Sequence, residues 1–269
     1  MTEYIQSLII GAIQGVSEFL PVSSSGHLVL VPYMFSWDYR GLSFDVALHF
    51  GTLLAIVIYF GKDWVEIIGN AFRPALSKGP VARYPKDLLW KIVVASIPAA
   101  IVGVFIEDYV EEFLHSPLLL ATNLVVFGAL LWLSDKYAKK HDASKTQLLS
   151  YGNTFLIGLA QAIALVPGVS RSGITMTAGR ALGLDRDQAA RISFLLGTPA
   201  MAGAFLFKLG DLKLISLDHA FWSGFIASTA FGFITIKYLL QYLRKSDFSI
   251  FFWYRLMLAI VVIFTYFAK

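Results

Sequence analysis

The chain has 269 residues, a formal net charge of +4, no cysteine and a mean hydropathy of +0.67. Hydrophobic residues make up 57% of it and charged residues only 15%, whereas a soluble domain carries about 25% charged residues. The composition therefore predicts a membrane protein, and it excludes a disulfide framework, thiol catalysis and a cysteine-ligated metal.

Six apolar segments are long enough to cross a bilayer, which takes about 20 residues in a helix. They are residues 44–60, 91–106, 118–134, 188–208, 219–242 and 249–267. Lysine and arginine are concentrated in the connections 61–90 and 135–147 and in the turn near residue 244, whereas residues 107–112 are acidic. The positive-inside rule places the three basic connections in the cytoplasm and the acidic one outside, and it gives no reason to expect nucleic-acid binding.

Segments 4–31 and 149–182 are apolar but make poor spans, because proline, glycine and serine interrupt each of them. Each pattern predicts a short helix, a break and a second short helix. A helix from Ile5 to Phe19 would be about 22 Å long, shorter than a hydrocarbon core of about 30 Å. Irregular backbone at membrane depth needs cover from protein or water, so we expect two re-entrant hairpins inside the bundle.

The two interrupted segments are copies of one another. Gly11-Ala-Ile-Gln14 matches Gly158-Leu-Ala-Gln161, and at the same spacing Val22–Gly26 matches Val169–Gly173. Three spans follow each copy, so the second copy must be inverted in the membrane, as in many secondary transporters.

We therefore predict a single all-α polytopic membrane domain over residues 1–269. Six transmembrane helices and two re-entrant helical hairpins form two inverted-topology repeats, about 1–147 and about 148–269.

The two copies differ where chemistry would take place. Glu18 matches Leu165, Ser24 matches Arg171, and His27 matches Ile174. Ionisable groups at membrane depth are costly and mark functional sites. Glu18 and His27 supply an acid/base pair and the serine run a hydroxyl nucleophile, while Arg171 supplies a bidentate phosphate ligand.

Small polar residues on both loops complete the candidate site. Their hydroxyls and backbone amides are suited to holding an anion at a helix N-terminus. They are Ser23, Ser25, Gly26, Ser170, Ser172 and Gly173. Gln14 lies one helical turn before Glu18 on the same face. His49, in the first span, is interpreted as a buried structural histidine.

At these motifs the sequence resembles the undecaprenyl-diphosphate phosphatase family, the bacitracin-resistance membrane phosphatases. The first family motif stands here as Gln14-Gly-Val-Ser-Glu18-Phe-Leu-Pro-Val-Ser-Ser-Ser-Gly-His27, and the second as Pro167-Gly-Val-Ser-Arg-Ser-Gly-Ile-Thr175. The resemblance covers nearly the whole chain. It implies removal of the terminal phosphate from a polyprenyl diphosphate, which recycles the lipid carrier for cell-wall synthesis and confers bacitracin resistance.

The resemblance also implies essential roles for Glu18, His27 and Arg171, with Ser24 as a proposed nucleophile and Thr175 among the substrate-binding residues. It implies a divalent cation, Mg²⁺ or Ca²⁺, for which Glu18 and Gln14 are the candidate ligands. The neutral amide of Gln14 argues against a scheme in which two carboxylates hold the metal. The implied location is the inner (plasma) membrane, with the site opening to the outer side.

Three questions stay open at this point. The attacking group is Ser24, His27 or a metal-bound water. The same inverted repeats also fit a polyprenyl-phosphate flippase, and more weakly a scaffold with an inactive site. The expected partners are a polyprenyl diphosphate and the bilayer, and the sequence leaves self-association open.

Overall fold

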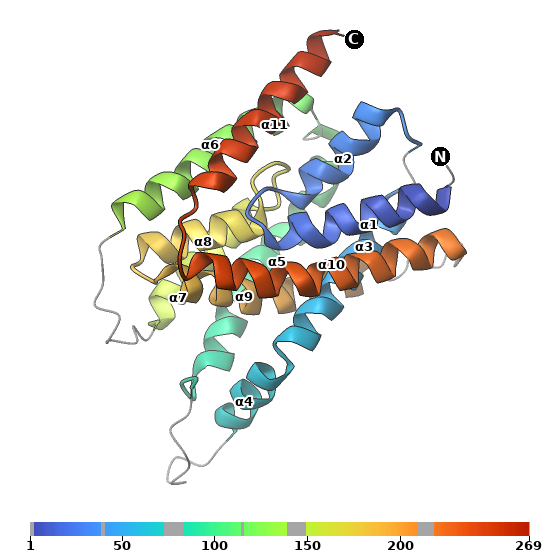
Figure 1. Cartoon of the computed structure of the whole chain (residues 1–269). Helices are drawn as coiled ribbons and strands as arrows, with labels where there is room; N and C mark the ends of the chain where they lie inside the picture. Colours follow the sequence, from blue (N-terminus) through green and yellow to red (C-terminus); the bar gives the residue numbers. More distant parts are fainter. Residues whose placement is uncertain are drawn as a thin grey trace.

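The computed structural model describes residues 3–38, 41–72, 83–113, 116–138, 149–208 and 218–268, apart from the side chains of residues 42–43 and 106–113. These residues form eleven helices and no strand (Figure 1). The helices are α1 Glu3–Phe19, α2 Ser24–Phe35, α3 Leu42–Tyr59, α4 Gly61–Ala71, α5 Leu88–Phe113, α6 Pro117–Tyr137, α7 Tyr151–Ile163, α8 Arg171–Ala181, α9 Arg186–Phe207, α10 His219–Leu243 and α11 Ser249–Ala268.

Each of the six predicted spans has a helix at its place. Among the described residues, α5, α6, α9, α10 and α11 are long and apolar enough to cross a membrane. The first predicted span corresponds to α3, which meets that requirement only together with α4, from which it is bent by 70°. Their surfaces are strongly apolar: Phe105 is 81% exposed and Phe267 is 74% exposed. Lipid is the solvent that such surfaces require, so the chain is a multi-pass membrane protein.

Two connections differ from the prediction. The segment predicted as a loop after residue 60 begins with α4, whose apolar residues Trp64, Ile67 and Ile68 follow helical spacing. The acidic segment 107–112 continues α5 to Phe113, and the next helix begins with Pro117 directly after its N-cap residue Ser116. No proline or glycine stands between Ile106 and Phe113 to end the helix earlier.

Several of the charged residues on which the predicted orientation rests lie outside the part of the chain that the structure describes. Arg73, Lys78, Lys139, Lys140 and Lys145 lie outside the described residues, as do the side chains of the acidic segment 107–112. The orientation therefore stays a prediction.

Both interrupted segments fold as helix, break and helix, as predicted: α1–α2 and α7–α8. The residue that ends each break is a serine with a positive φ, 75° at Ser23 and 73° at Ser170. Each serine caps the following helix, because its Oγ accepts a hydrogen bond from the backbone N–H of Gly26 or Gly173. Serine rarely adopts this backbone conformation, and such strain is concentrated at functional sites.

The first helix of each hairpin packs closely against one long helix. α1 lies along α10 and α7 lies along α5 (Figure 1). A Cβ atom at Gly11 would collide with the backbone of Gly224, and one at Gly158 would collide with the backbone of Ala95. The two glycines that the sequence comparison paired therefore have the same function, which is close backbone approach.

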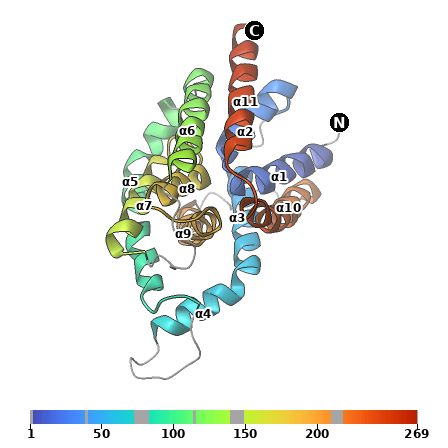
Figure 2. The same cartoon turned by 60° about the vertical axis from the view of Figure 1, so that its left-hand side comes forward.

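The long helices surround the two breaks. Figure 2 shows α9 between the group α5, α7 and α8 on one side and α3 and α10 on the other. α6 and α11 pack side by side. Both hairpins are thus enclosed by protein at their breaks, which is the condition for irregular backbone at membrane depth.

Candidate active site

The side chain of Glu18 is the centre of the polar contacts. Glu18 lies in the last turn of α1 and is only 6% exposed. Ser24 Oγ donates a hydrogen bond to Oε2 at 2.6 Å, Gln14 Nε2 donates to the same oxygen at 3.0 Å, and Arg171 Nη2 binds Oε1 at 2.5 Å. The structure therefore brings together three of the four predicted catalytic residues, Glu18, Ser24 and Arg171, and adds Gln14.

Two helices begin at this carboxylate. Ser24 is the first residue of α2 and Arg171 the first residue of α8, and the side chains of both reach Glu18. Helix N-termini carry a partial positive charge and unpaired backbone N–H groups. Two helix N-termini and one guanidinium next to a nucleophilic hydroxyl form a site suited to a phosphate group.

A glycine in α9 makes room for the guanidinium. A Cβ atom at Gly197 would collide with Arg171 Nη1. On the same helix, Met201 Sδ lies 3.1 Å from Arg171 Nη2. In the sequence, Gly51-Thr52 of α3 repeats as Gly197-Thr198 of α9, but the corresponding space at Gly51 is taken by the side chain of Ser228. The reason for a glycine at this position therefore differs between the two halves.

His27 lies on α2 with both ring nitrogens engaged. Nδ1 is 2.7 Å from the backbone oxygen of Ser23, and Nε2 is 2.6 Å from the hydroxyl of Tyr254 on α11. The two rings are stacked, with centroids 5.7 Å apart and planes 5° apart. The predicted acid/base pair of Glu18 and His27 is therefore not joined by a hydrogen bond among the described contacts.

His49 is not the buried structural histidine that the sequence suggested. Its Nε2 lies 3.5 Å from Glu18 Oε2, and its side chain is 38% exposed. Its Nδ1 is 2.8 Å from the backbone oxygen of Asp45, one helical turn earlier. The prediction was wrong because α3 turns this face toward the end of α1, and a single helix cannot indicate which neighbour it will meet.

The predicted substrate-binding residues fall into two groups. Ser25 is exposed, whereas Ser23, Gly26, Ser170, Ser172, Gly173 and Thr175 are buried. Ser172 Oγ donates to the backbone oxygen of Leu20 at 3.2 Å and so links the two breaks, and Thr175 Oγ1 donates to the backbone oxygen of Arg171 at 2.7 Å. The buried hydroxyls therefore hold the loops in place, and substrate contact by these residues stays a prediction.

Arg255 is a site residue that the sequence reasoning missed. It is completely buried on α11, where Nε donates to the Pro21 oxygen at 2.6 Å and both terminal nitrogens donate to the Val169 oxygen at 3.3 Å. One guanidinium thus holds the breaks of both hairpins. The signal was available, because a lone arginine inside an apolar span is a functional candidate by default.

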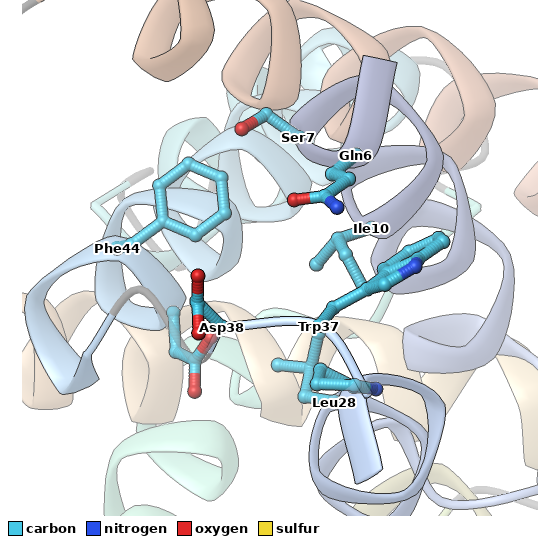
Figure 3. Close-up of a pocket in the computed structure, with 9 residues that line it drawn as sticks. Gln6, Ser7, Ile10, Leu28, Trp37, Asp38 and Phe44 are labelled. Atoms are coloured by element: carbon cyan, nitrogen blue, oxygen red, sulfur yellow. The ribbon is translucent and has the colours of Figure 1, made fainter. Parts of the chain in front are cut away.

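The small pocket drawn in Figure 3 is a separate feature. Gln6 and Ser7 of α1, Trp37 and Asp38 after α2, and Phe44 of α3 surround it. Its lining also includes the carboxylate residue Asp45. The pocket shares no residue with the contacts around Glu18 described above.

The donors around Glu18 fit a divalent cation that the substrate helps to bind. Among the described residues no group of three histidine, aspartate or glutamate side chains is arranged to hold a metal alone. Gln14 Oε1 is buried without a hydrogen-bond partner among those residues, next to the Glu18 carboxylate. Mg²⁺ is commonly bound by one or two protein oxygens together with substrate phosphates, which this donor set permits.

The described fold and contacts together define a class: a helical, multi-pass membrane protein in which a buried carboxylate binds a hydroxyl and a guanidinium, a geometry suited to an anionic group. The family model of the bacitracin resistance protein BacA matches residues 7–261. The chain belongs to this family, as its two long motifs indicated.

Curated relatives are similar over almost their full length. A protein of Pelotomaculum thermopropionicum named undecaprenyl-diphosphatase is 47% identical, with 96% of this chain and 95% of that protein covered. Proteins of the same name from Elusimicrobium minutum and Thermodesulfovibrio yellowstonii are 43% and 41% identical, covering 97% and 100% of both chains.

Proposed function

We propose that this protein is a membrane phosphatase that hydrolyses undecaprenyl diphosphate to undecaprenyl phosphate and inorganic phosphate. In that role it recycles the lipid carrier of cell-wall synthesis and confers bacitracin resistance. The contact that carries the proposal is the joining of Ser24, Glu18 and Arg171 across the two hairpin breaks. These contacts support Ser24 as the nucleophile, Glu18 as its base and Arg171 as the phosphate ligand. The names of the relatives supply the substrate class.

The reaction we propose has two steps. Arg171 exchanges its contact with Glu18 for the incoming diphosphate, which releases the carboxylate. Ser24 Oγ attacks the terminal phosphorus while Glu18 takes its proton, and the bond from that phosphorus to the bridging oxygen breaks. Undecaprenyl phosphate leaves, and Ser24 carries the phosphoryl group until water attacks it. The bond from phosphorus to Ser24 Oγ then breaks, the water oxygen leaves in inorganic phosphate, and Glu18 returns its proton to Ser24 Oγ.

Serine is preferred over histidine as the nucleophile because of their hydrogen bonds. Ser24 Oγ already donates to the carboxylate that would receive its proton, at 2.6 Å. Both nitrogens of His27 have other partners, the Ser23 carbonyl and the Tyr254 hydroxyl. An attack by His27 would first require one of these short hydrogen bonds to break, at a cost of about 1 kcal/mol or more.

A divalent cation, Mg²⁺ or Ca²⁺, belongs to the same proposal. Glu18 and Gln14 would hold it, with phosphate oxygens completing its ligands. The cation would supply charge neutralisation on the diphosphate. Arg171 and the N-termini of α2 and α8 bind the remaining negative charge.

The finer topology is also part of the proposal. Six transmembrane helices, with α3 as the first, and two re-entrant hairpins form inverted repeats in the plasma membrane. The matched geometry of Ser23 and Ser170 supports the repeat, and the distribution of basic loops supports a site that opens to the outer side. The prenyl chain stays in the lipid while the diphosphate reaches Glu18.

Phosphate release by the purified protein in detergent tests the proposal, since hydrolysis needs no second compartment whereas transport does. We expect release from a long-chain polyprenyl diphosphate in the presence of Mg²⁺ or Ca²⁺, and its loss in Arg171→Ala. Absence of release with either cation would refute the enzyme. Retention of most activity in Ser24→Ala, together with loss in His27→Ala, would refute the serine mechanism.

A further inference from the structure

The hydroxyl of Tyr254 covers the one nitrogen of His27 that faces away from its own helix. The contact between Tyr254 Oη and His27 Nε2 is 2.6 Å, and the rings are stacked nearly parallel. His27 is only 6% exposed, whereas Tyr254 is 46% exposed on the outer face of α11. The tyrosine therefore lies between the buried imidazole and the exposed surface of α11.

The backbone oxygen of Ser23 fixes the tautomer of His27. That oxygen only accepts hydrogen bonds, so the Nδ1 atom at 2.7 Å must carry a proton. In the neutral ring Nε2 then has a lone pair, and the Tyr254 hydroxyl donates to it. Each partner thus has one defined role, and the nitrogen free to gain a proton is the one that Tyr254 holds.

The neighbouring residue keeps Tyr254 in place. Arg255 is fully buried and binds the Pro21 and Val169 carbonyls, which lie in the two hairpin breaks. Pro21 is two residues before Ser23, whose carbonyl holds His27. The same turn of α11 is therefore fixed to the loop that carries His27, so the distance between the tyrosine and the imidazole is set by the bundle.

We propose that Tyr254 is a positioning residue for the phosphatase reaction, acting through His27. Its hydroxyl holds the ring in one orientation with Nε2 as the proton-accepting atom, and it keeps that nitrogen from acting as a nucleophile. This inference rests on the proposed function and adds to it a role for His27, three residues after Ser24 on α2, in proton exchange during the reaction. The partner of a catalytic histidine commonly has this effect on tautomer and orientation.

Tyr254→Phe tests the proposal because it removes one oxygen and keeps the stacked ring. We expect kcat to fall at least about tenfold, with KM within about twofold, since the loss affects the reacting geometry and not lipid binding. Tyr266→Phe is the matched control: this tyrosine is 41% exposed on the same helix, about 18 Å further along it. It should keep the wild-type kcat.

A double-mutant cycle shows whether Tyr254 acts through His27. Adding Tyr254→Phe to His27→Ala should cause no further loss beyond that of His27→Ala alone. Additive losses, or a raised KM with unchanged kcat, would mean that Tyr254 acts independently or binds substrate, and either result overturns the proposal.

Nitrogen NMR of protein with ¹⁵N-labelled histidine tests the contact without any assay of activity. The signals of His27, identified by their absence in His27→Gln, should show a protonated Nδ1 and an unprotonated, hydrogen-bonded Nε2. Tyr254→Phe should shift the Nε2 signal and leave Nδ1 in place. An unchanged Nε2 signal overturns the inference. If the wild-type protein releases no phosphate, the proposed function fails while this measurement still decides on the contact.

Discussion

Gly197→Ala should inactivate the site without altering any polar residue. The added Cβ atom would overlap Arg171 Nη1, so the guanidinium must leave its place beside Glu18. A hydrogen bond to a charged group contributes about 1.5–3 kcal/mol, and about 1.4 kcal/mol corresponds to a tenfold change in rate. If the displaced guanidinium no longer binds the phosphate in the transition state, kcat/KM falls roughly 10- to 100-fold.

Gly203→Ala is the matched control on α9. It makes the same chemical change in the same helix, but nothing lies within 4 Å of the added carbon. Both variants gain the same helix propensity, about 1 kcal/mol. Phosphate release in detergent, with size-exclusion profiles to verify folding, compares them. If Gly197→Ala keeps kcat/KM within threefold of Gly203→Ala, then the placement of Arg171 beside Glu18 is not needed for the reaction.

Two further predictions concern the surroundings of Glu18. Gln14→Glu puts a second carboxylate where an amide now donates to Glu18 at 3.0 Å. Phosphate release should then depend more steeply on Mg²⁺ and reach half its maximum at a roughly tenfold lower Mg²⁺ concentration, as measured by metal titration. An unchanged titration curve would remove Gln14 from the metal site. Arg255→Met leaves the Pro21 and Val169 carbonyls without their buried donor, and each unsatisfied carbonyl lowers the free energy of unfolding by about 1–3 kcal/mol. The midpoint of thermal unfolding should therefore fall by several degrees. An unchanged midpoint would show that the two breaks do not depend on this arginine.

Much of the fold follows from the sequence because helices and their interruptions are local features. The break before Ser24 was predicted from proline, glycine and serine residues, and the structure has it there. α4 was missed although its apolar spacing is helical, because the length of α3 alone already satisfied the requirement for a span. The end of α5 was placed too early because acidic residues were interpreted as a loop although nothing in them ends a helix.

The sequence indicated Glu18, Ser24 and Arg171 as candidate residues, and the structure brings these three together, while their catalytic roles stay predictions. Glu18, Ser24 and Arg171 could be paired because the repeat aligns Ser24 with Arg171, and both meet the same carboxylate. His49 and Tyr254 could not be placed, because their roles depend on which helix face meets which hairpin. That information belongs to the packing of elements far apart in the chain, and neither residue has a counterpart in a motif that would indicate it.

The asymmetry of the centre also favours hydrolysis over transport. A transporter built from inverted repeats exchanges the conformations of its two halves, so each state needs equivalent contacts. Here the counterpart of Glu18 is Leu165 and the counterpart of Arg171 is Ser24, so the pair formed by Glu18 and Arg171 has no equivalent in the other half.

An exchanged state would separate this buried pair and replace it with a leucine and a serine. An uncompensated buried charge costs about 3–5 kcal/mol, enough to keep the exchanged state below about 1% of the population. We therefore expect proteoliposomes to release phosphate from polyprenyl diphosphate in their outer leaflet without moving labelled polyprenyl phosphate between leaflets. Movement of that label at a rate comparable to hydrolysis, lost again in Arg171→Ala, would show that the halves exchange despite the unequal pair.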